Sequence, residues 1–382
     1  MLASQRALFD IPREVCFLNA AAWSPLPKAS QEAGRIGAGR KGQPWKLAPD
    51  FALQQHERAR KAAARLINAD PADVALISSV GYGVATAGKI LQVPRGSRVL
   101  LLENDHTSPM LEWIGRAEAQ GFTVDIVPQP ADADWTQALM TAIERPDAAP
   151  IGLASISSIH WSDGGALDLD RIAPALKRQG AALLVDATHG AGIMALDVRR
   201  LDPDFLVFPT YKWVLGPYGR AFLYVAKRHQ AGVPLEQTSF GRRAVAAERV
   251  PYFDDVRYVE SARRFDMGER DHFISMEMAA IGMEMVAEWG SAAILERLRM
   301  LTRRLAEGLG NSGALIAEER VRAPHILCLG FPKGMPAGLV ERLAAEQVYA
   351  APRLGRLRIS PHVYNDEEDV DRFIEVFRKH GA

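Results

Sequence analysis

The chain has 382 residues, of which 48% are hydrophobic and 24% charged, a composition typical of a folded globular protein and not of a disordered one. Lys plus Arg and Asp plus Glu both number 46, so the formal net charge is zero. We therefore expect neither a nucleic-acid nor a membrane partner, since both usually require a basic excess. This length suits two domains, or one large domain with an appendage.

The two cysteines, Cys16 and Cys328, are far apart and show neither a CxxC motif nor metal-ligand spacing. We expect no disulfide framework and no metal site, and a reducing compartment. Residues 1–14 carry charges and a proline and lack the apolar core of a signal peptide. No apolar stretch is long enough to span a bilayer. The sequence thus predicts a cytoplasmic protein.

From about residue 50, short apolar runs alternate with helix-period stretches such as residues 169–177. This alternation predicts an α/β domain with a mostly parallel sheet that helices cover on both faces. Only a short Gly/Pro segment separates the last two runs, so one connection there is expected to be antiparallel. The runs are residues 74–77, 97–102, 123–127, 151–156, 181–186, 205–209 and 221–225.

Beyond about residue 250 the pattern changes. A long helical pattern covers residues 274–288, and its four methionines are expected to pack in a core. Two further apolar runs, 326–331 and 357–360, precede an amphipathic C-terminal helix for which Asn365 and Glu368 form the predicted cap. These elements predict a second, smaller α/β domain.

An apolar strand ends at Asp186, and His189 follows three residues later. Ligands of open α/β sheets bind at the carboxyl ends of strands, and a carboxylate buried there needs a partner. The alternative is that Asp186 only caps a following helix.

A second apolar strand runs into Thr210, Tyr211 and Lys212, followed by a Gly/Pro-rich turn. Lys212 is either a surface charge or a desolvated amine suited to carbonyl chemistry. Asp186 and Lys212 together favour pyridoxal phosphate (PLP), which needs a lysine for its Schiff base and an acid to keep its pyridine nitrogen protonated.

The pattern D-A-x-H-x-x-G at residues 186–192, followed by a lysine preceded by Tyr, resembles the class V aminotransferases of PLP fold type I. That group includes cysteine desulfurases, kynureninases and isopenicillin-epimerase-like enzymes, and the resemblance runs from residue 17 to residue 365. It implies a three-layer α/β/α large domain at residues 18–255. It also implies a small domain of residues 1–17 and 256–382 that includes the linking helix, and a homodimer with its active sites at the subunit interface.

The resemblance also implies the catalytic roles. Lys212 would form the aldimine with PLP and shuttle the proton at the substrate α-carbon. Asp186 would pair with the pyridinium nitrogen, and His189 would lie near the phenolic oxygen or the Schiff base.

The phosphate is expected at the turn after residues 74–77, where backbone amides and a helix N-terminus can hold an anion. Most such turns bind nothing, and this chain has Gly81 where the family often has Thr. The residues expected to hold the phosphate are Ser79, Val80 and Gly81, with Thr210 or Tyr211.

Four further residues complete the predicted site. His106 matches the position that stacks on the cofactor, the alternative being an ordinary loop histidine. Trp161 matches a segment near the ring oxygen, although Asp163 stands where the family often has Thr. Arg358 lies inside an apolar strand, where its charge must be paired, and the family uses the matching Arg for the substrate α-carboxylate. A structural ion pair is the alternative for Arg358, and Asn19 is also assigned to the substrate site.

Residues 267–270 resemble the segment with which a partner subunit completes the phosphate site. Glu269 would repel a phosphate there, so either Arg270 compensates it or the contact is absent.

The reaction is less determined than the cofactor. A cysteine desulfurase needs a mobile nucleophilic Cys before the Arg strand, and residues 348–354 contain none. Cys328 lies in an apolar run, where it is expected to be buried and unreactive. We prefer a β-lyase, acting on a C–S bond or in a kynureninase-like way, by analogy with Tyr211 and Trp161. An aminotransferase or epimerase and a non-enzymatic binding protein remain open. A dehydrogenase would need a G-x-G-x-x-G motif after the first strand, where Gly81 and Gly83 alone are a weak match.

Overall fold

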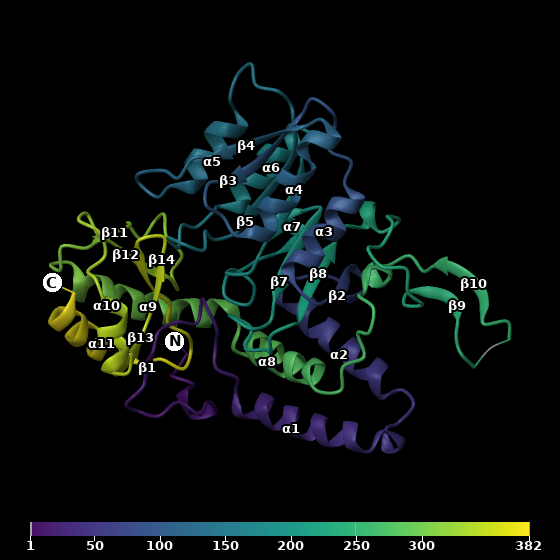
Figure 1. The fold of residues 1–382 in the computed structure, drawn as a ribbon, viewed down its shortest axis with the longest axis horizontal. Helices are drawn as coiled ribbons and strands as arrows, with labels where there is room; N and C mark the ends of the chain where they lie inside the picture. The colour runs from purple at the N-terminus through teal and green to yellow at the C-terminus, as the bar shows by residue number, and fades with distance from the viewer. Residues whose placement is uncertain (1, 249, 382) are drawn as a thin grey trace.

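The computed structural model describes residues 2–248 and 250–381, and its largest element is a seven-stranded sheet (Figure 1). The strands lie in the order β2-β8-β7-β6-β5-β3-β4. β8 is antiparallel to its neighbours β2 and β7, and the other adjacent pairs are parallel, which confirms the predicted antiparallel connection. The strands are β2 (Val74–Ile77), β3 (Arg98–Leu102), β4 (Thr123–Val127), β5 (Ile151–Ser157), β6 (Ala182–Asp186), β7 (Phe205–Pro209) and β8 (Ala221–Val225).

Helices cover both faces of this sheet. Alternate residues of each strand point to opposite faces, and they join two separate hydrophobic clusters. α3 (Val80–Ile90) and α4 (Thr107–Gln120) pack on one face. The other face holds α2 (Phe51–Leu66), α5 (Trp135–Ile143), α6 (Leu169–Arg178), α7 (Val198–Leu201) and α8 (Ser275–Trp289). The predicted three-layer α/β/α architecture is confirmed.

The C-terminal part forms a smaller α/β unit with its own hydrophobic cluster, which also contains Leu18 and Ala20 from the N-terminal segment. Figure 1 shows both chain ends in this part of the molecule. The division at residue 255 stays a prediction. The sheets are β11-β12-β15-β14 and β1-β13, built from β1 (Cys16–Phe17), β11 (Leu315–Ile316), β12 (Leu327–Gly330), β13 (Val348–Tyr349), β14 (Ala351–Arg353) and β15 (Arg356–Ile359), and the helices are α9 (Ser291–Leu309), α10 (Leu339–Ala345) and α11 (Glu367–His380).

The predicted cap of the C-terminal helix is wrong by one residue. Asp366 caps α11, and the side chains of Asp366 and Asp369 exchange hydrogen bonds with each other's backbone N–H. Asn365 instead donates from its side chain to Phe17 O and Asp369 Oδ2. It therefore ties the N-terminal segment to α11.

Two elements extend along or beyond the body (Figure 1). α1 (Lys28–Gly42) packs beside α8, and the hairpin of β9 (Arg242–Val245) and β10 (Phe253–Tyr258) projects outward. Taken singly, none of the described helices is both long and apolar enough to cross a membrane; α8 and α9 pass that test only as a pair, and an 81° bend separates them.

α8 also fixes the loop that follows β7. Its methionines Met276 and Met283 are buried in the core, as predicted. Gly282 approaches this loop so closely that a Cβ there would lie 2.5 Å from Val214 O and 2.6 Å from Leu215 O. The loop carries Lys212, so the helix holds the chain that positions this amine.

A buried ion pair joins α2 to the end of the large sheet. Arg60 and Asp266 form two side-chain hydrogen bonds, of 3.1 and 2.8 Å, and neither side chain is exposed. Asp266 Oδ1 also accepts from Leu76 N in β2 at 2.8 Å. The pair therefore connects α2, β2 and the segment before α8.

Replacing Asp266 with Ala leaves Arg60 buried and without this carboxylate. We expect Asp266→Ala to lower the free energy of unfolding by about 3 to 5 kcal/mol. The matched control is Asp371→Ala, which removes the exposed pair between Asp371 and Arg304. It should change the free energy of unfolding by less than about 1 kcal/mol. Equal losses in urea unfolding would contradict a special role for the buried pair.

Candidate active site

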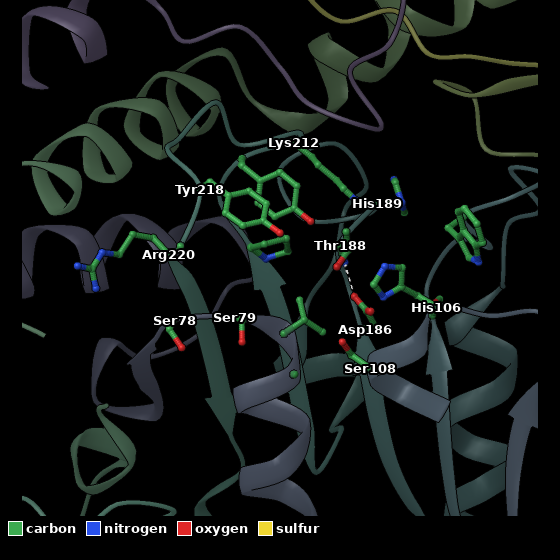
Figure 2. Close-up of a pocket in the computed structure, with 17 residues that line it drawn as sticks. Ser78, Ser79, His106, Ser108, Asp186, Thr188, His189, Lys212, Tyr218 and Arg220 are labelled. Atoms are coloured by element: carbon green, nitrogen blue, oxygen red, sulfur yellow. Dashed lines mark hydrogen bonds between the residues drawn. The ribbon is translucent and has the colours of Figure 1, made fainter. Parts of the chain in front are cut away.

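A cavity of about 200 Å³ lies where β2, β6 and β7 end and α3 begins (Figure 2). Nine of the predicted site residues line it: Ser79, Val80, Gly81, His106, Trp161, Asp186, His189, Tyr211 and Lys212. The fold thus brings residues far apart in the sequence to one edge of the sheet, as the carboxyl ends of its parallel strands require.

Lys212 follows β7 and is 8% exposed. Burial, followed by the positive charge of Arg358, lowers the pKa of its amine to about 7, against the opposing effect of Asp186. Its Nζ lies 3.4 Å from His189 Nε2. The surface-charge alternative for Lys212 is therefore wrong.

Asp186 ends β6 and is buried. Its Oδ1 accepts from Thr188 N at 2.8 Å, the bond drawn in Figure 2, and turns rather than a helix follow it, so the helix-cap alternative is wrong. Among residues 2–248 and 250–381, no hydrogen bond reaches Oδ2. This oxygen is available to a cationic donor in the cavity.

His189 is buried between Lys212 and Trp213. Trp213 Nε1 donates to His189 Nδ1 at 3.0 Å. Burial, and then the charge of Lys212, hold the pKa of the His189 ring well below its usual value. The ring is therefore neutral near pH 7.

The N-terminus of α3 offers unpaired amides to the cavity. Ser79 caps the helix, its Oγ accepting from Tyr82 N at 3.1 Å. The N–H groups of Val80 and Gly81 are the first two of the helix, which have no partner within it. Together with the helix dipole they form a site for an anion.

His106 and Trp161 form one side wall. Their rings meet edge to face at 6.1 Å, and the Trp161 indole donates to Asn104 O at 2.7 Å. Burial lowers the pKa of His106. Asp105 accepts from His106 N at 2.7 Å and from Ser157 Oγ at 2.7 Å, which fixes the start of this loop.

Three predicted residues do not line the cavity. The Thr210 hydroxyl donates to Pro217 O at 2.5 Å and so stabilises the turn after Lys212. Arg358 is 1% exposed and donates from Nη1 to Trp161 O at 2.6 Å. Asn19, beside Ser360, has a buried Oδ1 without a hydrogen-bond partner.

Arg358 is not part of a structural ion pair. Within the described part of the chain no carboxylate lies within 4.0 Å of its guanidinium, and its Nε is buried without a partner. Burial, followed by the nearby Arg353, lowers its pKa to about 10. The fold thus keeps a buried cation that an anion can neutralise.

Sequence reasoning missed eight residues of the cavity wall. Most of them stand within two residues of a predicted site residue or in the Gly/Pro-rich turn after Lys212, so neighbourhood in sequence could have found them. Only the packing of separate elements identifies Ser157 and Arg220. The missed residues are Ser78, Ser108, Ser157, Thr188, Pro209, Tyr218, Gly219 and Arg220.

Arg270 is not free to compensate Glu269. Its guanidinium pairs with Asp266 and lies 3.9 Å from the centre of the Phe240 ring. A contact between residues 267–270 and a partner's phosphate stays a prediction, as does the homodimer.

The donor set fits pyridoxal phosphate. Free amides at α3 suit its phosphate, the open oxygen of Asp186 suits its pyridinium nitrogen, and the buried amine of Lys212 suits its aldehyde. The His106 ring can cover one face of the cofactor.

Comparison with known proteins gives the same assignment. Residues 46–373 match the protein family described as Aminotransferase class-V. The chain is 28% identical to an uncharacterised aminotransferase of Bacillus subtilis, covering 88% of this chain and 85% of the relative. It is 26% identical to isopenicillin N epimerase of Streptomyces clavuligerus, covering 94% and 93%.

Solved structures share the fold. The cystine C–S lyase C-DES, in complex with its product cysteine persulfide, superposes with a TM-score of 0.84 at 19% identity, covering 97% of this chain and 99% of that one. Because the family match covers most of the residues, the chain belongs to the class V aminotransferases and is an enzyme with pyridoxal phosphate as its cofactor.

Proposed function

We propose that the enzyme holds pyridoxal phosphate as a Schiff base on Lys212 and acts on an amino acid or amino-acid conjugate. The observation that carries this proposal is the buried amine itself, with a pKa near 7. An amine that is largely neutral at physiological pH can attack an aldehyde, whereas an ordinary exposed lysine is almost entirely protonated.

The surrounding residues would orient the cofactor. Asp186 would accept from the pyridinium N–H, and the amides of Val80 and Gly81 would hold the phosphate, while Ser79 caps the helix that presents these amides. Once bound, the cofactor acts as an electron sink for negative charge at the substrate α-carbon. Lys212, whose pKa lies near neutrality, then takes or returns the proton at that carbon.

His189 presents a hydrogen-bond donor to this centre. An indole N–H can only donate, so the bond from Trp213 requires a lone pair on His189 Nδ1. In the neutral ring the proton must then sit on Nε2, the atom that faces Lys212. His189 would therefore offer its Nε2 hydrogen as a donor to the cofactor held at Lys212.

Arg358 would bind the substrate α-carboxylate. A buried guanidinium without a carboxylate partner is costly, and a bidentate carboxylate is the ligand that fits its geometry. Asn19, with its unpaired Oδ1, can accept from the same substrate.

For the bond that breaks, we favour β-lyase chemistry. Both cysteines are buried: burial raises the pKa of Cys328 to about 12 and that of Cys16 higher still, so neither supplies a thiolate. Tyr211 lies with its ring centre 5.5 Å from Lys212 Nζ, and burial raises its pKa to about 12. Its hydroxyl therefore stays protonated and can donate a hydrogen bond to a leaving sulfur or carbon.

An aminotransferase or epimerase is the second candidate. It is favoured by the matches to the Bacillus aminotransferase and to isopenicillin N epimerase, which span most of both chains. Either reaction would use the same Lys212, Asp186 and Arg358, and it would differ in the fate of the proton at the α-carbon.

The pH dependence of PLP capture tests the role of Lys212. The rate at which apoenzyme takes up PLP, followed by absorbance, should rise with pH through about 7 and then level off, because only the neutral amine reacts. Arg358→Gln removes a nearby positive charge, so it should raise the Lys212 pKa and move the midpoint to higher pH. Arg356→Gln, on the same strand, is the control and should leave it in place.

Peptide mapping after borohydride reduction locates the attachment. We expect the reduced cofactor on the peptide that contains Lys212, and a Lys212→Ala protein without the Schiff-base absorbance. An adduct on another lysine would contradict the proposal.

The Trp213 contact predicts the tautomer of His189. In ¹⁵N spectra of the apoenzyme, Nε2 of His189 should be the protonated nitrogen, and Trp213→Phe should let the proton move to Nδ1. In the holoenzyme this variant should also shift the pH at which the Schiff-base absorbance titrates. Trp161→Phe is the control: its indole donates to Asn104 O and not to His189, so the tautomer should be unchanged.

Product analysis separates the two candidate reactions. With amino acids and cysteine conjugates, a lyase releases pyruvate and ammonia, or alanine and a cleaved side chain, without a second substrate. Turnover only in the presence of a keto acid, or inversion of the α-carbon without other products, would instead establish the second candidate.

A further inference from the structure

A tight hairpin stands where a desulfurase would need its mobile cysteine. β14 and β15 pair with Arg353 opposite Arg356 and Ala351 opposite Arg358. Leu354 and Gly355 form the turn, both with positive φ, of 44° and 78°. Residues directly opposite one another share a face of the sheet, so Arg353 projects from the same face as Arg358.

Arg353 lies against the wall of the active-site cavity. Its guanidinium is 5.9 Å from the centre of the Trp161 ring, and the carbonyl of Trp161 accepts from Arg358 at 2.6 Å. Trp161 itself lines the cavity. The two arginines therefore contact one residue of that wall.

The local charge is unbalanced. In residues 2–248 and 250–381, no carboxylate lies within 4.0 Å of Arg353, whose only hydrogen bond goes to its neighbour Pro352 O. Burial lowers the Arg353 pKa, and Arg353 in turn lowers the pKa of Arg358 and of Lys212. Asp186 is the one acid that opposes these cations at Lys212, and the proposed function assigns it to the cofactor.

The positive charge of Arg353 calls for an anion of its own. The proposed function places the cofactor phosphate at the start of α3 and the substrate α-carboxylate at Arg358. An anion that reaches Arg353 must then come from the other end of the substrate, since half-buried arginines are best stabilised by bidentate carboxylates.

We infer that Arg353 is a specificity-determining residue and that the substrate is an amino acid whose side chain carries a carboxylate. This inference rests on the proposed function, because it requires Arg358 to hold the α-carboxylate. Arg353 binds the side-chain acid, and Trp161 packs against the chain between the two charged ends.

The test compares acids with their amides, which match in size and differ in charge. Holoenzyme is titrated with L-aspartate and L-asparagine, and with L-glutamate and L-glutamine, and the change in cofactor absorbance gives each Kd. In at least one pair we expect the acid to bind about tenfold more tightly or better, since each factor of ten is about 1.4 kcal/mol.

Three variants and one control test which arginine causes that preference. Arg353→Gln should remove the preference and leave the Kd of the amide unchanged, and Arg353→Lys should restore part of it. Arg358→Gln should weaken acid and amide alike. Arg356→Gln is the matched control, since Arg356 lies on the same face but lines a different groove, with Cys328 and Asp163; it should keep the wild-type preference.

Two results would overturn the inference: amides that bind the wild-type enzyme as tightly as the acids, or a preference that survives in Arg353→Gln. Either leaves the proposed function intact if the holoenzyme still shows its cofactor spectrum and responds to amino acids. A protein that takes up no PLP, or whose cofactor spectrum responds to no amino acid, would overturn both.

Discussion

The active site depends on how poorly the positive charge of Lys212 is stabilised. The amine is removed from water and lies near two arginines, and within the described residues Asp186 is the acid that opposes them. This charge imbalance lowers the stability of the free protein, and in return it gives Lys212 a pKa near 7. Anionic ligands would relieve the same imbalance, so the forces that keep Lys212 reactive also favour an anionic cofactor and substrate.

The fold creates this environment by bringing chain ends together. Parallel strands deliver Asp186 and the loop of Lys212 to one edge, and α3 starts at the same edge with free amides. β8 is antiparallel to β7, so a turn that contains Tyr218 joins them, and Gly282 of α8 packs closely against the same loop. Arg358, to which we assign the substrate α-carboxylate, comes from the smaller C-terminal sheet, so the proposed substrate site would draw on both parts of the molecule.

The sequence was most informative at positions where a residue type is unusual unless it has a particular function. An acid at a strand end and a lysine before a Gly/Pro turn pointed to Asp186 and Lys212, and short apolar runs located the strands of the large sheet. Thr210 was predicted to reach the phosphate, but its hydroxyl is used by the turn carbonyls. The wall residues Ser157 and Arg220 and the shift of the α11 cap to Asp366 depend on contacts between distant segments, which local pattern does not encode.

The burial of both cysteines has a consequence for where such an enzyme can work. Cys16 Sγ donates to Asp369 O at 3.1 Å, and Cys328 Sγ donates to Ser162 O at 3.6 Å. Peroxides and alkylating reagents attack thiolates, and burial raises the pKa of both thiols far above neutrality. Because the proposed chemistry uses neither thiol, we expect the activity of this enzyme to respond to its substrates and not to oxidants that act on thiols.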